Sequence, residues 1–138
     1  MIEYKDSKNI NDTDLRALYS AEGWISYTER FHDLSVLLRD CNCVWSAWDG
    51  QRLVGLIRTI GDNCSITYIQ DVIGLPEFQG KGIGSKLFRK VLDDTTHIRQ
   101  LVLITDNSKE TQHIRDWYEK MGMKRNEAFG VVGYYMQR

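Results

Sequence analysis

The chain has 138 residues, of which 42% are hydrophobic and 27% are charged, and its formal net charge is −1. That length fits one domain spanning residues 1–138, and the composition is typical of a globular protein. The near-neutral charge provides no basic field, so we expect neither nucleic acid nor a membrane surface as a partner. Three cysteines without paired zinc spacing predict free thiols, no metal site and a cytoplasmic location.

The N-terminal third of the chain predicts one strand followed by two helices. Residues 2–5 form a short β-rich segment, and Asn11 or Thr13 is placed to cap a helix. Apolar residues at helical spacing line one side of that helix: Leu15, Leu18 and Tyr19. Thr28 would cap a second helix, whose apolar face carries Phe31, Leu34 and Leu38.

The predicted connection between these helices is aromatic, with Trp24 and Tyr27 following Gly23. Binding groups often lie on loops that a rigid scaffold carries, so the two rings indicate the lip of a binding pocket. Packing that joins the two helices explains the same rings equally well. Both interpretations stay open at this point.

Residues 44–73 are typical of three antiparallel strands joined by hairpins. The segments 44–48, 53–60 and 64–73 are rich in β-branched and aromatic residues. Asp49-Gly50 and Gly61-Asp62-Asn63, both common turn sequences, separate them. We therefore expect a meander in the sheet.

A glycine-rich turn follows the last of these strands and leads into a helix. Pro76, the only proline, ends the strand, and Gln79-Gly80-Lys81-Gly82-Ile83-Gly84 precedes apolar residues at helical spacing. Glycines let the backbone approach a bulky anion, and the free amides of a first helical turn point toward it. The segment therefore predicts an anion-binding turn.

Two other glycine-rich phosphate loops fit this turn poorly. A Walker A loop has four residues between its glycines and then Lys-Ser/Thr, whereas five residues separate Gly74 from Gly80, and Lys81 precedes Gly82. The dinucleotide fingerprint G-x-G-x-x-G, counted from Gly80, would end at Ser85. Neither of these loops accounts for the turn.

The C-terminal part predicts one buried strand, one helix and two short strands. Residues 101–104 are apolar throughout, which indicates a buried strand parallel to the one before the glycine turn. A helix beginning near Ser108 or Glu110 would end at Gly122. Residues 123–126 and 131–136 would then close the end of the sheet, and a homodimer formed there is a further hypothesis.

The turn and its flanks carry the pattern Q-x-x-G-x-G/A, filled by Gln79, Gly82 and Gly84, and a later Tyr-Glu-Lys-x-Gly at residues 118–122. In these motifs the chain resembles the GNAT superfamily of N-acetyltransferases, over roughly residues 4–136. The resemblance implies an α/β (α+β) fold with a mixed, mostly antiparallel sheet of six to seven strands and about four helices. It also implies a splayed pair of parallel strands at the coenzyme site.

Acetyl-CoA is the co-substrate that this resemblance implies. Its pyrophosphate would lie on the amides of the turn, beside the Lys81 ammonium: Gly80, Gly82, Ile83, Gly84 and Ser85. In the superfamily the splayed strand exposes main-chain groups to the pantetheine arm, here those of Val72, Ile73 and Gly74, and one such amide faces the thioester as an oxyanion donor. Thr111 occupies the position of an asparagine that helps to hold the coenzyme.

Catalytic roles are expected for Tyr118 and Asp71. Tyr118 matches the superfamily's tyrosine, and a phenol that titrates near 10 can protonate a developing thiolate, although a tyrosine that only packs is the alternative. Asp71 is an acid inside an apolar strand, which suits either a base for the amine or a carboxylate satisfied by its neighbours. The segment around Asp71 is similar to plastid-type serotonin N-acetyltransferases, a likeness that also assigns Asp106 to the acceptor site.

The sequence therefore predicts an acyltransferase that moves acetyl from acetyl-CoA directly to a primary amine. Asp71 with Trp24 and Tyr27 would suit a small cationic amine. A protein or peptide acetyltransferase is the alternative among enzymes, and a non-catalytic CoA-binding or sensing module is the alternative from another class.

Overall fold

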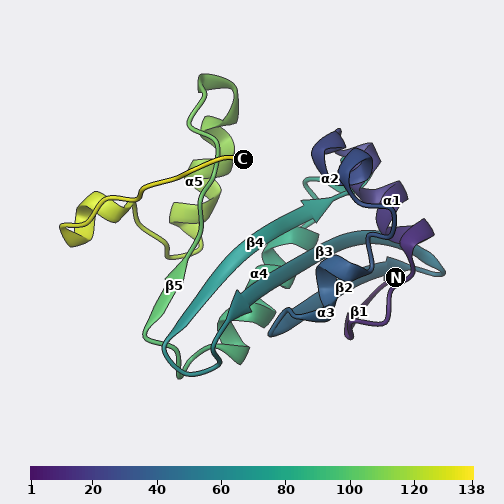
Figure 1. The fold of residues 1–138 in the computed structure, drawn as a ribbon, viewed down its shortest axis with the longest axis horizontal. Helices are drawn as coiled ribbons and strands as arrows, with labels where there is room; N and C mark the ends of the chain where they lie inside the picture. Colours follow the sequence, from purple (N-terminus) through teal and green to yellow (C-terminus); the bar gives the residue numbers. More distant parts are fainter. The chain divides into compact units, whose positions relative to one another are not determined.

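A five-stranded sheet organises the first of two units into which the chain divides, residues 1–104 and 105–138. The computed structural model describes every residue from 1 to 138. The strands lie in the order β1-β2-β3-β4-β5, and only β5 is parallel to its neighbour (Figure 1). The mixed, mostly antiparallel sheet predicted from the sequence is therefore confirmed.

The predicted meander is present with small changes at its boundaries. The strands are β1 (Ile2–Asp6), β2 (Cys43–Asp49), β3 (Arg52–Gly61), β4 (Ile66–Gly74) and β5 (Gln100–Val102). The register of β3 on β4 shifts after Arg58, which pairs with Asp71, because the next pair is Thr59 with Ile69. Gln70 is thus the extra residue of a β-bulge, a feature that bends a strand and redirects its side chains.

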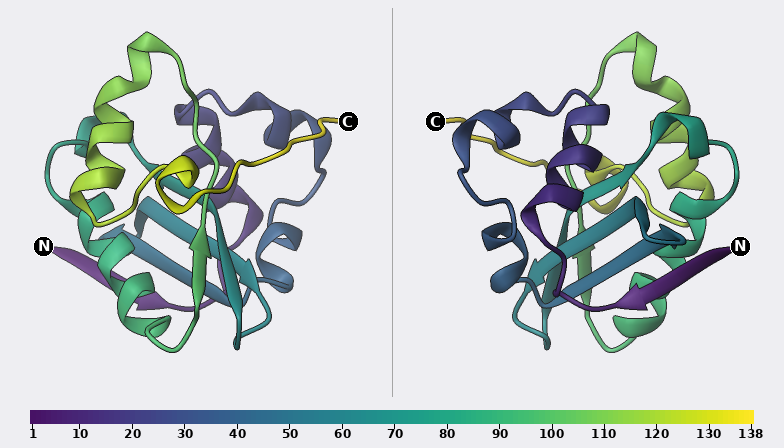
Figure 2. Two further views of the ribbon diagram at one scale, coloured as in Figure 1. Left: turned by 90° about the vertical axis from the view of Figure 1, so that its left-hand side faces the viewer. Right: turned by 90° about the vertical axis from the view of Figure 1, so that its right-hand side faces the viewer.

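Helices cover both faces of this sheet. A Cβ atom added to Gly55 in β3 would lie 3.0 Å from Ile83 and 3.2 Å from Leu87, both in α4 (Ile83–Asp94). Arg58, three residues further along β3, points to the opposite face, where α1 (Asp12–Ala21) contacts β3 and β4. Figure 2 shows α4 on one side of the strands and the N-terminal helices on the other.

The first helix follows the sequence prediction, and the second does not. Asn11 caps α1 by accepting a hydrogen bond from the Asp14 amide at 2.8 Å, and Leu15, Leu18 and Tyr19 are buried, as predicted. In place of one helix capped by Thr28, the chain forms α2 (Ile25–Arg30), which contains Thr28 and Tyr27, and the one-turn α3 (Val36–Arg39).

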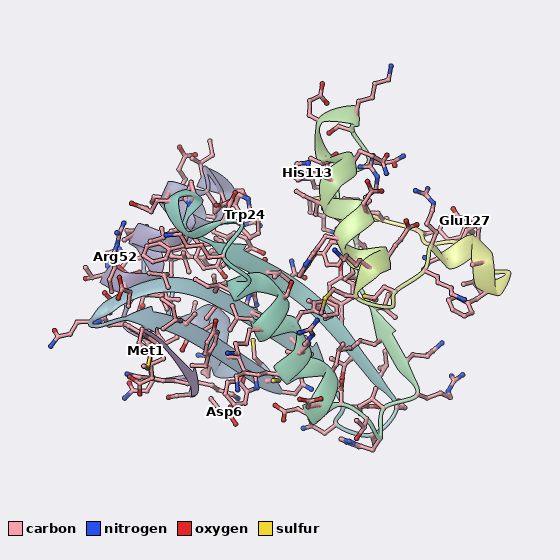
Figure 3. All side chains as sticks on the ribbon, turned by 180° about the vertical axis from the view of Figure 1, so that it is seen from behind. Met1, Asp6, Trp24, Arg52, His113 and Glu127 are labelled. Atoms are coloured by element: carbon pink, nitrogen blue, oxygen red, sulfur yellow. The ribbon has the colours of Figure 1, made fainter.

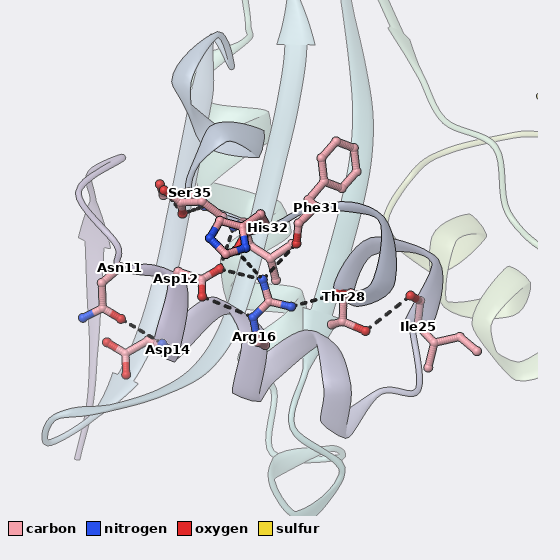
Figure 4. Close-up of polar contacts among 11 residues, drawn as sticks. Asn11, Asp12, Asp14, Arg16, Ile25, Thr28, Phe31, His32 and Ser35 are labelled. Carbon is pink, nitrogen blue, oxygen red and sulfur yellow. Dashed lines mark hydrogen bonds and ion pairs between the residues drawn. The ribbon is translucent and has the colours of Figure 1, made fainter.

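Arg16 explains why that second helix is interrupted. Its guanidinium on α1 donates to the carbonyl oxygens of Thr28, Phe31 and His32 at 2.7 to 3.1 Å (Figure 4). Phe31 has an extended backbone, which ends α2, and the Arg16 side chain supplies donors to carbonyl oxygens at and beyond this end of the helix. A tertiary contact therefore overrides the helical spacing of the apolar residues.

The second unit, described by itself, contains α5 (Gln112–Lys120) between two 3₁₀ turns, η2 (Lys109–Thr111) and η3 (Asn126–Phe129). Gly122 ends the helix as predicted, with a φ of +104°. The strands predicted at 123–126 and 131–136 are absent, so the sheet has five strands instead of six or seven, and there are five α-helices. A strand needs a partner strand, and residues 105–138 contain none.

The longest helix, α4, has 12 residues. No helix combines the length with the apolar character that crossing a bilayer requires.

Candidate functional site

The glycine turn leads into α4 in the conformation that a phosphate site requires. Gly80 and Gly82 have φ values of +79° and +81°, and a Cβ atom on either would meet nothing within 4 Å. Glycine is thus needed here for the left-handed backbone and not because space is short. Gly82 is the N-cap of α4, and the first turn of the helix contains no acidic residue. No acidic side chain of the first turn of α4 therefore neutralises the positive end of the helix dipole, which favours an anion.

Strand β4 loses its parallel neighbour partway along its length. It pairs with β5 only over residues 66–68, opposite 100–102, and no strand lies on that side of residues 69–74. The splayed parallel pair expected from the resemblance is therefore present. A stretch of β4 edge remains available for hydrogen bonds to another molecule.

The register decides which main-chain groups point to this open edge. The Leu75 amide donates to the Val54 carbonyl at 2.9 Å, which identifies the residue pair 54/75 as hydrogen-bonded. Because the pattern alternates, Ile73 directs its amide and carbonyl toward β3, whereas Val72 and Gly74 direct theirs to the open edge. In this register the sheet already uses the Ile73 amide and carbonyl, which were expected to be free.

The space around position 74 would accept a side chain, so crowding does not explain the glycine there. A Cβ atom there would meet only the Val54 carbonyl oxygen, at 3.8 Å, which is ordinary van der Waals contact. Its cross-strand partner Gly55, by contrast, lies against α4. The packing around Gly74 therefore does not require a glycine at this position.

Gln79 links the glycine turn to two other segments. Its side-chain amide donates to the Gly74 carbonyl at 3.3 Å and to the Glu22 carboxylate at 2.9 Å. Glu22 is the C-cap residue of α1 and is half-buried. The sequence prediction missed this residue, although an acid at the negative end of a helix dipole is unfavourable and is a signal that could have found it.

Asp71 lies in a buried network of four polar side chains. Its Oδ2 accepts from Arg58 Nε at 2.5 Å and from the Tyr19 hydroxyl at 2.8 Å, and its Oδ1 accepts from the Tyr27 hydroxyl at 3.0 Å. The side chains of Arg58 and Asp71 are 7% and 2% exposed. The contacts are those of a carboxylate satisfied by its neighbours, the second interpretation left open above. Three of the acceptor sites of this carboxylate are therefore already in use.

Tyr27 is the most connected hydroxyl of this network. Besides donating to Asp71, it accepts from Gln70 Nε2 at 3.1 Å and from an Arg58 Nη atom at 3.3 Å. Burial, followed by the negative charge of Asp71, raises the pKa of Tyr27, and the same two causes raise the pKa of Tyr19 further. Both phenols therefore remain neutral donors at neutral pH.

Trp24 packs beside these tyrosines and is partly exposed. Its ring centroid lies 5.8 Å from that of Tyr19 and 6.3 Å from that of Tyr27, and the side chain is labelled in Figure 3. The packing interpretation of this aromatic connection is thus observed. The exposed part of the ring leaves surface that a ligand can touch.

Arg16 holds the segment that follows Trp24 and Tyr27 against α1. Besides its three carbonyl contacts, it forms an ion pair with Asp12 at 3.0 Å, and Asp12 in turn accepts from the Leu34 amide at 2.6 Å (Figure 4). The hydrogen bonds from Arg16 and Leu34 lower the pKa of Asp12. The segment after Tyr27 is therefore fixed at several main-chain points.

The second unit carries the other three expected site residues. Tyr118 is half-buried on α5, with its ring centroid 4.9 Å from that of Trp117. Asp106 is exposed and accepts from the Ser108 hydroxyl at 2.7 Å, a bond that lowers the pKa of Asp106. The Thr111 hydroxyl accepts from Arg115 at 2.8 Å, so it already has a partner inside its own loop.

Side chains that could together hold a metal ion are not clustered anywhere in the chain: no group of three or more His, Cys, Asp or Glu residues has that arrangement. The three cysteines are free thiols, and Cys64 is the exposed one.

Comparisons with known proteins point to one family. The sequence model of the Acetyltransferase (GNAT) family matches residues 8–123. The chain is 27% identical to the uncharacterized N-acetyltransferase ycf52 of Pyropia yezoensis over 143 aligned residues. The alignment covers 97% of this chain and 79% of that protein.

Solved structures share the fold. A GNAT-family acetyltransferase from Streptococcus pneumoniae superimposes with a TM-score of 0.85 at 30% identity, covering 100% of this chain and 98% of that one. The aminoglycoside N-acetyltransferase AAC(6')-Iy, whose structure was solved in complex with CoA, superimposes with a TM-score of 0.68 at 17% identity, covering 100% and 95% of the two chains.

The buried ion pair predicts a large effect of a small substitution. Asp71→Asn leaves the Arg58 guanidinium buried without its counter-ion, so we expect it to lower the free energy of unfolding by about 3–5 kcal/mol in urea titrations. Asp40→Asn is the matched control, because the Arg39–Asp40 pair is exposed and is expected to contribute less than about 1 kcal/mol. Equal small losses in both variants would contradict the structural role of Asp71.

Proposed function

Because this chain belongs to the GNAT family of acetyltransferases, we propose that it transfers the acetyl group of acetyl-CoA directly to a small primary amine. The observation that carries the proposal is the left-handed glycine turn at the start of α4, which follows a β4 edge that no strand covers. One domain spanning residues 1–138 is part of the proposal, supported by a family match that runs across both units.

The coenzyme pyrophosphate would bind at the glycine turn. Its oxygens would accept from main-chain amides of the turn and of the first helical turn: Gly80, Gly82, Ile83, Gly84 and Ser85. Lys81, whose ammonium lies 5.0 Å from the Phe78 ring centroid, would add positive charge for a phosphate. Thr111 stays a proposed coenzyme contact, with its hydroxyl shared between the ligand and Arg115.

The pantetheine arm would pair with the open edge of β4 as an added strand does. The Val72 amide and carbonyl and the Gly74 amide point there, while the Gly74 carbonyl already accepts from Gln79. An amide at this edge would also donate to the thioester oxygen as negative charge develops on it, and a donor that is already fixed needs no reorganisation.

The transfer itself would be a direct attack of the amine on the thioester carbon. The nitrogen lone pair forms the C–N bond, the C–S bond breaks, and its electron pair leaves on sulfur. Tyr118 would supply a proton to the thiolate, because a neutral phenol with a reference pKa near 10 is present at neutral pH. Asp71, expected from the sequence to be a base, enters the proposal as the residue that positions the Tyr27 hydroxyl.

The acceptor would be a small amine carried near the aromatic connection. Trp24 and Tyr27 offer ring surface to a cation, and Asp106 is an exposed acid that suits an ammonium group. A peptide acetyltransferase and a CoA sensor in which Tyr118 only packs are the two competitors. Thiol release from acetyl-CoA with a panel of small amines, compared with lysine-containing peptides, separates all three.

A homodimer is proposed for the C-terminal segment. Its large apolar side chains are more than half exposed: Phe129, Val131, Val132, Tyr134, Tyr135 and Met136. An apolar stretch of this size is typical of an interaction surface, and its β-branched and aromatic residues suit strand pairing. The proposed compartment remains the reducing cytoplasm, supported by the three free thiols.

The glycine turn gives a direct test of coenzyme binding. Gly82→Ala forces a side chain into the left-handed region, at a cost of roughly 1–2 kcal/mol, and displaces the amides of the turn. We expect its affinity for acetyl-CoA to fall at least about tenfold in isothermal titration calorimetry. Gly50→Ala, in the β2–β3 hairpin with a φ of +60° and the same open surroundings, should lose similar stability and keep its affinity. Equal affinities in both variants would contradict a coenzyme site at the turn.

Tyr118→Phe tests the proposed acid. It removes only the hydroxyl, so we expect kcat with the best amine of the panel to fall by about 10²–10⁴ while the dissociation constant of acetyl-CoA is unchanged. Tyr134→Phe, at an exposed tyrosine in the C-terminal segment, is the control. A Tyr118→Phe enzyme with the wild-type rate across the pH range would identify a residue that only packs.

Sedimentation equilibrium tests the dimer. We expect a species of twice the 16.1 kDa chain mass, and a shift toward the single-chain mass when Tyr134 and Tyr135 are both replaced by serine, which removes apolar area from the contact. A wild-type protein that sediments only at 16.1 kDa at all concentrations tested would rule the dimer out.

A further inference from the structure

Glu22 brings a carboxylate from the first helix to the glycine turn. Its Oε1 and the Gly74 carbonyl oxygen accept from the same nitrogen, Gln79 Nε2, at 2.9 and 3.3 Å. Gly74 is the last residue of β4, where the open edge reaches the turn. One acid thus lies where the open edge of β4 reaches the proposed pyrophosphate turn.

Glu22 differs from Asp71 in how much of its bonding capacity is used. The Asp71 carboxylate accepts three hydrogen bonds, one of them from a buried cation, whereas Glu22 accepts one and forms no ion pair. Its second oxygen is left for another donor. Burial raises the pKa of Glu22 and the bond from Gln79 lowers it, with a net increase and no contribution from a charged neighbour. The Glu22 carboxylate therefore has acceptor capacity for a bound ammonium group.

The surroundings of Glu22 suit a cationic amine. Trp24, two residues further on, carries the partly exposed ring that packs on Tyr19 and Tyr27. An ammonium held by a carboxylate beside an aromatic face gains from both interactions. Glu22 and Trp24 flank Gly23 at the C-terminal end of α1, and the Arg16 contacts hold Thr28 and Phe31, a few residues further on, against the same helix.

We propose that Glu22 binds the ammonium of the acceptor and takes the proton that the amine must lose before it attacks. The assignment rests on the function proposed above and names the base for that same site. The ammonium gives one proton to the Glu22 carboxylate, and the neutral amine then attacks the thioester carbon. The second nitrogen proton leaves as the tetrahedral intermediate collapses and is balanced by the proton that the thiolate receives through Tyr118. Glu22 returns its proton to water, so one proton is released per turnover.

Glu22→Gln tests this role, because the amide keeps the size of the side chain and its oxygen can still accept from Gln79. With an alkylamine, which is protonated at pH 7, we expect kcat/KM to fall by about 10²–10⁴. With an arylamine, which is neutral at that pH, we expect a loss of less than about tenfold, because no proton has to be removed first. Retained turnover of the arylamine also reports that the variant is folded.

The pH profile gives a second measurement. Glu22 must be ionised to accept a proton, so wild-type kcat/KM for the alkylamine should fall as the pH drops through the raised pKa of this carboxyl group. That acidic limb should be absent in Glu22→Gln and present in Glu22→Asp, which keeps a carboxylate. Glu29→Gln, at an exposed position on α2, is the control and should match the wild type.

The outcomes separate this proposal from the function on which it rests. Equal losses of alkylamine and arylamine turnover in Glu22→Gln, or an unchanged acidic limb, would overturn the role of Glu22 and leave the acetyltransferase assignment intact. A wild-type enzyme that binds acetyl-CoA and acetylates none of the amines would overturn the proposed acceptor class, and the role of Glu22 with it.

Discussion

The early end of the β4–β5 pairing is the constraint on which the candidate site depends. A buried or half-buried strand edge must find partners for its amides and carbonyls, and β5 supplies them only as far as Tyr68. Beyond that residue, the antiparallel register with β3 turns the groups of Val72 and Gly74 outward. The sheet thus leaves a short main-chain template, and the glycine turn lies at the end of the same strand.

Two carboxylates near this strand, Asp71 and Glu22, have different electrostatic surroundings. Asp71 is enclosed with Arg58 and two phenols, an arrangement that fixes the bulged part of β4 against α1 and α2. Glu22 has one hydrogen bond and no counter-ion. Structural and proton-accepting roles are therefore best divided between them, because a group that stabilises the fold through its charge gives up that stability when it is protonated.

The sequence predicted the features that depend on local chemistry. The Asn11 cap, the hairpin strands, the glycine turn and the end of α5 at Gly122 each follow from residues within one turn or one strand. Features set by distant contacts were missed or left open. Arg16 binds main-chain carbonyls where one helix was predicted after Thr28. Arg58 on the neighbouring strand forms an ion pair with Asp71, and Gln79 donates a hydrogen bond to Glu22, 57 positions away in the sequence. The predicted strand at 131–136 likewise depends on a partner that residues 105–138 do not contain.

The contacts of Gln79 give a physical reason for a glutamine at the first position of the Q-x-x-G-x-G/A motif. A glutamine amide has two N–H donors, and here one nitrogen serves both the carbonyl at the end of β4 and the carboxylate at the end of α1. Either contact alone could be made by a shorter or a charged side chain. A neutral amide makes both contacts without adding positive charge, whereas an ammonium or guanidinium at this position would pair with Glu22 and lower its pKa. The glutamine thus holds the carboxylate in place without neutralising it, which is the condition that a base beside a cationic amine has to meet.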